Sequence, residues 1–198
     1  MRYPETRPPV FTLTAGPVDA YPEVLRAMGA TVLYDYDPAF QNFYEQVALK
    51  AQKAMGTDVP PTILHGEPVL GLEAAAASLI AKDDVVLNLA SGPYGKGFGY
   101  WAARYAARVD EIEVAYNDCI DPDAVRAHLK AHPETAVVAV CHHDTPSGTL
   151  NDINSIGAVV AEAGALLIVD AVSSWGGMKT SPDACKAGIY ITGPNKCL

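Results

Sequence analysis

The sequence predicts an α/β fold: a mainly parallel sheet flanked by helices. From about residue 60 onward, short apolar runs alternate with helix-like stretches, which is the pattern of strand–helix–strand units. Several runs are continuous rather than alternating, as expected for strands covered on both faces. The chain has 198 residues, of which 49% are hydrophobic and 19% charged, an ordinary balance for one globular domain.

The elements follow from these runs in order. The expected strands are 62–65, 85–90, 112–115, 136–141, 165–170 and 189–192. The expected helices between them are about 68–80, 98–107, 121–131 and 152–163, with Asp121-Pro122 as a helix start. An earlier helix begins after Asp37 and ends at Gly56, because its apolar side chains recur at helical spacing. We expect residues 1–20, which contain four prolines, to form an extended arm, and 21–198 the body.

Charge and composition argue against several classes of function. The net charge is −9 and the 14 lysines and arginines are scattered, so nucleic acid is not an expected partner. No apolar run reaches the roughly 20 residues of a membrane helix, and the start does not resemble a signal peptide, so we expect no membrane association and a cytoplasmic location. No metal is expected, since the four cysteines are widely spaced and the adjacent His142 and His143 point to opposite faces of a strand.

Polar residues follow the expected strands at the edge where ligands bind in open α/β sheets. These residues are Gly66-Glu67, 91–94, Asp144-Thr145, Asp170 and Lys196. Asp170 and Lys196 suggest the chemistry. A lysine amine can form a Schiff base with the aldehyde of pyridoxal, while a carboxylate keeps the ring nitrogen protonated.

These segments together resemble a known family. The chain is similar to the N-terminal part of a class V aminotransferase, of fold-type I and alanine-glyoxylate type. The resemblance implies the large pyridoxal-phosphate-binding domain of that fold, incomplete at its C-terminus and without the C-terminal domain. The matching segments are 13–17, 65–68, 94, 144–148, 169–174 and 193–196.

The resemblance also implies a role for each matching residue. Lys196 would be the catalytic residue that forms the aldimine, and Asp170 would pair with the ring nitrogen. Tyr94 would stack on one face of the ring and Val172 would pack on the other. Thr145 would hydrogen-bond near the 3-oxygen of the ring.

One position departs from the family pattern. Typical relatives bind the phosphate of pyridoxal phosphate in a turn of small residues at a helix N-terminus. Here that turn is Gly66-Glu67. A carboxylate about 4 Å from one phosphate charge costs about 4 kcal/mol at an effective dielectric constant of about 20, or roughly three decades of affinity. Glu67 would therefore select the unphosphorylated vitamer, unless it only stabilises its helix and the phosphate is held elsewhere.

Within the family, the resemblance is to members that transfer an amino group between pyridoxamine and pyruvate, giving pyridoxal and L-alanine in vitamin B6 degradation. Pyridoxal and pyridoxamine would then be substrates in the cofactor site. One alternative is a pyridoxal 5'-phosphate-dependent alanine- or serine-glyoxylate aminotransferase. Another is an inactive truncated homologue that acts as a binding or dimerisation module.

The resemblance implies a full-length protein of about twice this length, which we expect to be a homodimer or homotetramer. We therefore expect the arginines that clamp the substrate carboxylate to lie outside the chain. We also expect the isolated chain to expose apolar surface, to dissolve poorly and to be inactive.

Overall fold

The sheet is the centre of the molecule. The computed structural model describes residue 16 and residues 19–197. Five strands, all parallel, lie in the order β2-β1-β3-β6-β7. Their bounds are β1 Val85–Ala90, β2 Arg108–Glu113, β3 Thr135–Cys141, β6 Leu166–Asp170 and β7 Ile189–Ile191. A mainly parallel sheet flanked by helices is thus confirmed.

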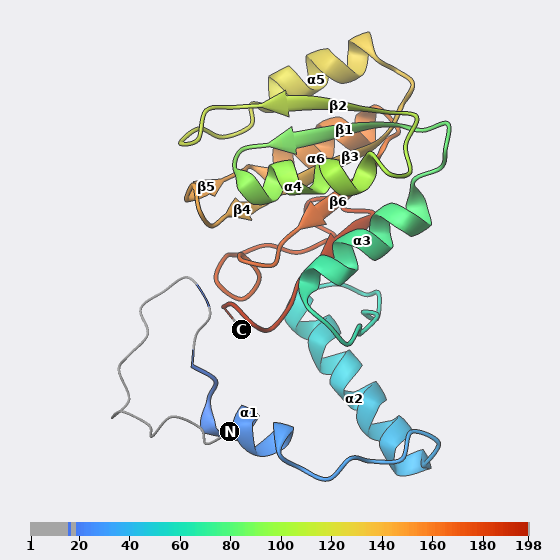
Figure 1. Cartoon of the computed structure of the whole chain (residues 1–198), viewed down its shortest axis with the longest axis vertical. Coiled ribbons are helices and arrows are strands. Elements are labelled where there is room, and N and C mark those ends of the chain that lie inside the picture. Colours follow the sequence, from blue (N-terminus) through green and yellow to red (C-terminus); the bar gives the residue numbers. More distant parts are fainter. Residues whose placement is uncertain (1–15, 17–18, 198) are drawn as a thin grey trace, which may run out of the picture.

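The remaining strands form a separate hairpin that follows β3. Asp144 of β4 (His143–Asp144) pairs with Thr149 of β5 (Thr149–Leu150) in antiparallel register. The helices are α1 Pro22–Met28, α2 Pro38–Met55, α3 Pro68–Leu79, α4 Pro93–Ala102, α5 Pro122–Ala131 and α6 Ile153–Glu162. Figure 1 shows α1 and α2 extending away from the sheet, whereas the other helices lie against it.

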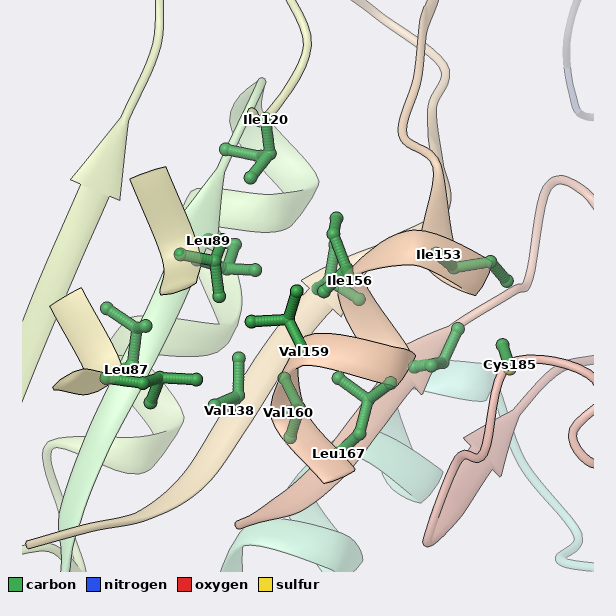
Figure 2. Close-up of a cluster of buried hydrophobic side chains, with 14 of the residues drawn as sticks. Leu87, Leu89, Ile120, Val138, Ile153, Ile156, Val159, Val160, Leu167 and Cys185 are labelled. Carbon is green, nitrogen blue, oxygen red and sulfur yellow. The ribbon is translucent and has the colours of Figure 1, made fainter. Parts of the chain in front are cut away.

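Both faces of the sheet are buried, and alternate strand residues pack on opposite sides. Leu87 and Leu89 of β1 face α5 and α6 in one apolar cluster, shown in part in Figure 2. Val86, from the same strand, faces α3 and α4 in a second cluster with Phe98. The continuous apolar runs in the sequence arise from this double coverage.

Local chemistry sets the ends of two helices as expected. The carboxylate of Asp37 accepts a hydrogen bond from the N–H of Ala39 (2.8 Å), and that of Asp121 accepts one from Asp123 (2.9 Å). In each case proline occupies the first helical position, where no N–H is needed. Helix α2 ends at Gly56, whose φ of 67° is the left-handed conformation that glycine adopts at little cost.

One expected strand and two expected boundaries were wrong. Residues 62–65 form no strand, and Ile63 and Leu64 are 41% and 47% exposed. Strand β2 starts four residues early, at Arg108, because pairing with β1 continues through polar residues at this edge of the sheet. Helix α4 begins at Pro93 rather than near 98, since its glycines allow close packing on β1.

The N-terminal segment departs from expectation in one further respect. Helix α1 was not predicted, because its seven residues include no buried side chain and show no core-facing stripe. The proposed arm over residues 1–20 lies outside the described residues except for residues 16, 19 and 20.

Large exposed apolar side chains concentrate before α3. They include Tyr21, Met28, Val32, Tyr34 and Tyr36, each at least 69% exposed. In the part of the chain that the structure describes, no helix has the length and apolar character needed to cross a membrane.

Substituting Gly157 tests how closely α6 packs. A Cβ at this position would lie 1.8 Å from the carbonyl oxygen of Cys185, which is backbone and cannot rotate away. Gly157→Ala should therefore lower the free energy of unfolding by about 1–3 kcal/mol or more in urea titrations. Gly97→Ala in α4 is the control: nothing lies within 4 Å of its Cβ, so stability should rise by up to about 1 kcal/mol. Equal effects would contradict the packing described.

Candidate active site

Asp170 lies at the centre of the site. It is the last residue of β6, paired with Cys141 of β3 on one side and Ile191 of β7 on the other. Its carbonyl oxygen accepts a hydrogen bond from the N–H of His142 (2.8 Å). Its carboxylate Oδ1 accepts one from the N–H of Val172 (3.0 Å). The backbone of Asp170 is thus fixed from both neighbouring strands.

The electrostatics of Asp170 favour a positively charged partner. Burial raises the pKa of this carboxyl, the Val172 hydrogen bond opposes the rise, and the charge of Asp144 adds to it. Burial and the nearby carboxylates of Asp170 and Asp144 also raise the pKa of the Cys141 thiol well above its usual value, so Cys141 stays protonated. A cation beside Asp170 would restore its ionised form.

Tyr94 and Asp170 line the same small cavity. Its other walls include Gly95, Phe98, Cys141 and Ile168, and its volume is about 10 Å³, roughly the space of one water molecule. Tyr94 lies in the first turn of α4, and its side chain is 55% exposed. The structure therefore brings together the residue expected to stack on a ring and the residue expected to pair with its nitrogen.

Lys196 lies in the turn that follows β7. Contacts on both sides hold this turn in place. On one side, a Cβ on Gly193 would be 2.8 Å from Cγ of Pro68, so the loop lies against the start of α3. On the other, the thiol of Cys197 donates a hydrogen bond to the carbonyl oxygen of Ser173 (3.6 Å).

The N-terminal segment also reaches Lys196. A Cβ on Gly16 would lie 2.8 Å from Nζ of Lys196. The φ of Gly16 is +141°, a backbone conformation that residues other than glycine rarely adopt. Glycine is therefore needed here both for its conformation and for the approach of the lysine.

Gly66 and Glu67 lie at the start of α3 rather than after a strand as expected. Glu67 is the N-cap of this helix, yet its side chain makes no capping hydrogen bond and is exposed. Because Pro68 contacts Gly193, this helix start lies beside the loop that carries Lys196. The carboxylate of Glu67 is thus available for a ligand rather than for its own helix.

Thr145 and Val172 complete the expected set. Thr145 follows Asp144 in the β4–β5 hairpin, and its hydroxyl is buried without a hydrogen-bond partner among the described residues. Such an unpartnered group is costly unless a ligand satisfies it. Val172 is linked to Asp170 through its N–H and is partly buried against the apolar cluster of α3 and α4.

Sequence reasoning missed the residues that join the strand ends. The amide of Asn151 donates to Ser91 Oγ and to the carbonyl oxygen of Cys141, both at 2.7 Å. Its Oδ1 accepts from the N–H of Ile120 (2.9 Å). Asn151 is 1% exposed, and its sequence context, a short polar turn, does not distinguish it from a surface residue.

The two adjacent histidines have separate structural partners. Nδ1 of His142 lies 2.8 Å from Ser174 Oγ, and Nδ1 of His143 lies 3.0 Å from Ser173 Oγ. Among residues 16 and 19–197, no group of three or more His, Cys, Asp or Glu side chains is placed to hold a metal ion.

Comparison with known proteins places this geometry in a family. Residues 99–198 match the model described as Aminotransferase class-V. The chain is 73% identical to the pyridoxamine–pyruvate transaminase of Mesorhizobium japonicum, covering 100% of this chain and 50% of that protein. It is 33% identical to the (S)-ureidoglycine–glyoxylate transaminase of Bacillus subtilis, covering 94% of this chain and 45% of that protein.

Solved structures agree on the fold. The crystal structure of pyridoxamine-pyruvate aminotransferase from Mesorhizobium loti superposes with a TM-score of 0.94 at 73% identity, over 100% of this chain and 50% of that one. The mainly parallel sheet flanked by helices is that of fold-type I aminotransferases. The chain spans about half the length of the curated relatives it matches. It belongs to the class V aminotransferase family.

Proposed function

We propose that the protein containing this chain is a transaminase that transfers an amino group between pyridoxamine and pyruvate, giving pyridoxal and L-alanine. The main support is one observation: Asp170 and Tyr94 line one cavity at the strand ends. The relative with 73% identity over the whole chain carries this activity in its name, which favours the same substrates.

The chemistry of the described residues supports binding of a pyridoxal ring. The partly buried Asp170 carboxylate needs a cation, and a protonated ring nitrogen supplies one. The unpartnered hydroxyl of Thr145 can donate to the 3-oxygen. Tyr94 and Val172 supply an aromatic and an aliphatic side chain for the two faces of the ring. When bound, such a ring withdraws electrons from the carbon that loses its proton.

Lys196 supplies the base. As an unprotonated amine, its Nζ can take up a proton and release it again. From a fixed loop, Nζ would move the proton between the 4'-carbon of the vitamer and the α-carbon of the amino acid. Contacts at Gly193 and Cys197 anchor this loop on both sides, so the loop would lose little freedom when the vitamer binds.

Glu67 is the proposed selector of the unphosphorylated vitamer. Its exposed carboxylate at the start of α3 makes no capping hydrogen bond and lies on the helix end where relatives would hold a phosphate. It repels a phosphate dianion and can accept a hydrogen bond from a 5'-hydroxyl. Pyridoxal and pyridoxamine would thus enter and leave as substrates.

Further parts of the proposal concern the cell and the assembly. A role in vitamin B6 degradation follows if pyridoxamine is the substrate. A homodimer or homotetramer in the cytoplasm is expected from the family resemblance. The exposed apolar side chains around α1 and α2 are consistent with burial in a larger assembly.

Replacing Lys196 tests the catalytic assignment. In the full-length protein, Lys196→Ala should lower turnover by at least about 10²–10⁴-fold, because proton transfer loses its base. Borohydride added with pyridoxal should label the peptide containing Lys196 in the wild type but not in the variant, as read by mass spectrometry. The exposed Lys179→Ala variant is the control and should keep both activity and label. Turnover near wild type in Lys196→Ala would refute the assignment, and no label in the wild type would favour an inactive homologue.

Asp170→Asn should separate stability from binding. The pKa of Asp170 is raised by folding, so ionisation destabilises the unliganded protein as the pH rises above the ordinary carboxyl range. At neutral pH the variant should therefore have the higher melting temperature, and the difference should vanish below about pH 4, where both states are protonated. Affinity for pyridoxal should fall by about 10–100-fold as the ring nitrogen loses its partner. A variant that is less stable at neutral pH would contradict this account.

Glu67→Gly tests vitamer selection. The variant should bind pyridoxal phosphate up to about a thousandfold better relative to pyridoxal, since the repulsion is removed. Glu67→Gln keeps the size of the side chain and loses its charge, so most of the gain should persist if charge is the cause. Titration of each variant with both vitamers gives the ratio. An unchanged ratio would show that Glu67 is not the selector, and tight phosphate binding by the wild type would favour the glyoxylate aminotransferase alternative.

A further inference from the structure

Asp144 is a fully buried carboxylate for which the proposed chemistry has no direct use. It lies in β4, and its exposed fraction is 0%. Oδ2 accepts a hydrogen bond from the N–H of Gly95 in α4 (2.8 Å). Oδ1 is buried with no hydrogen-bond partner among the described residues. Burying an oxygen of this kind lowers stability, because no hydrogen bond offsets the loss of water.

The contact with Gly95 is a helix cap supplied from a distant segment. Gly92, the N-cap of α4, has no side chain to cap its helix, and Pro93 has no N–H. Gly95 is the third helical residue, whose N–H an N-cap side chain would normally bind. Asp144 takes that role from 49 residues away.

Close packing keeps the carboxylate in this position. A Cβ on Gly92 would lie 2.4 Å from Cγ of Asp144, so any other residue at 92 would displace the carboxylate. The carbonyl oxygen of Gly95 accepts a hydrogen bond from Asn88 Nδ2 of β1 (3.1 Å). Gly95 is therefore held at its N–H by Asp144 and at its C=O by Asn88.

We propose that Asp144 is the positioning residue of the site: by binding the N–H of Gly95 it fixes the first turn of α4 and so sets the place of Tyr94 at the cavity it shares with Asp170. Tyr94 directly precedes Gly95, and its side chain is 55% exposed, so few contacts of its own hold it. The negative charge of Asp144 at the positive end of α4 strengthens this anchor.

Amide exchange tests the anchor without any ligand. In the unliganded full-length protein, Asp144→Ala should speed exchange of the Gly95 amide by about 10–100-fold, because this amide loses one hydrogen bond to a charged group. The Leu87 amide of β1 should stay protected. Asp144→Asn keeps an acceptor and should largely restore protection. Gly92→Ala, which displaces the carboxylate without removing it, should resemble Asp144→Ala. Asp121→Ala is the matched control: it removes from α5 a capping hydrogen bond of similar length, and exchange at Gly95 should not change. Unchanged exchange at Gly95 in Asp144→Ala would overturn the proposal.

Ligand binding tests the link to Tyr94, and this step rests on the proposed function. Asp144→Ala should weaken pyridoxal binding by about tenfold or more, but should have no further effect in a Tyr94→Ala background, because the two residues act through one contact. Equal losses in both backgrounds would overturn the positioning role in favour of a direct charge effect on the ring. If the wild type binds no pyridoxal, the proposed function fails, while exchange at Gly95 still decides whether Asp144 anchors α4.

Discussion

The parallel pairing of β3 with β6 is the constraint on which the site depends. It sets Cys141 beside Asp170 and aligns the N–H of His142 with the carbonyl oxygen of Asp170. Asp170 therefore ends a strand that has hydrogen-bonded neighbours on both sides, and its backbone is fixed by that pairing. Burial at this position raises the pKa of the carboxyl, so a cation beside it would stabilise the ionised form.

Glycine brings three pairs of segments into close contact. Gly95 brings α4 close to β1, Gly157 brings α6 against the backbone of Cys185, and Gly193 brings the lysine loop against Pro68. Of these three glycines, Gly95 lines the small cavity of the site. A side chain at Gly95 would push α4 away from β1, so this wall of the cavity depends on the absence of a side chain.

The sequence predicted the parts of this arrangement that depend on local pattern. The strands of Leu87 and Val169 are recognisable because burial on both faces requires continuous apolar residues. The start of strand β2 was predicted four residues too late, because its first residues are mostly polar and join the sheet through backbone pairing, so no apolar run marks them. Asp144 escaped notice as a helix cap because its partner is 49 residues away, and no local spacing marks such a contact. The roles of all the site residues, Lys196 and Asp170 among them, remain predictions.

The two residues proposed to act on the ring are held in different ways. Asp170 ends β6, which pairs with both β3 and β7, whereas Lys196 lies in a turn held by Pro68 and by the hydrogen bond from Cys197 to Ser173. Local contacts of this kind open at lower free energy than strands paired on both sides. Local opening would therefore move the loop of Lys196 before it moved the ring-binding walls, so that loss of the proposed catalysis and loss of binding would have separate thresholds during heating.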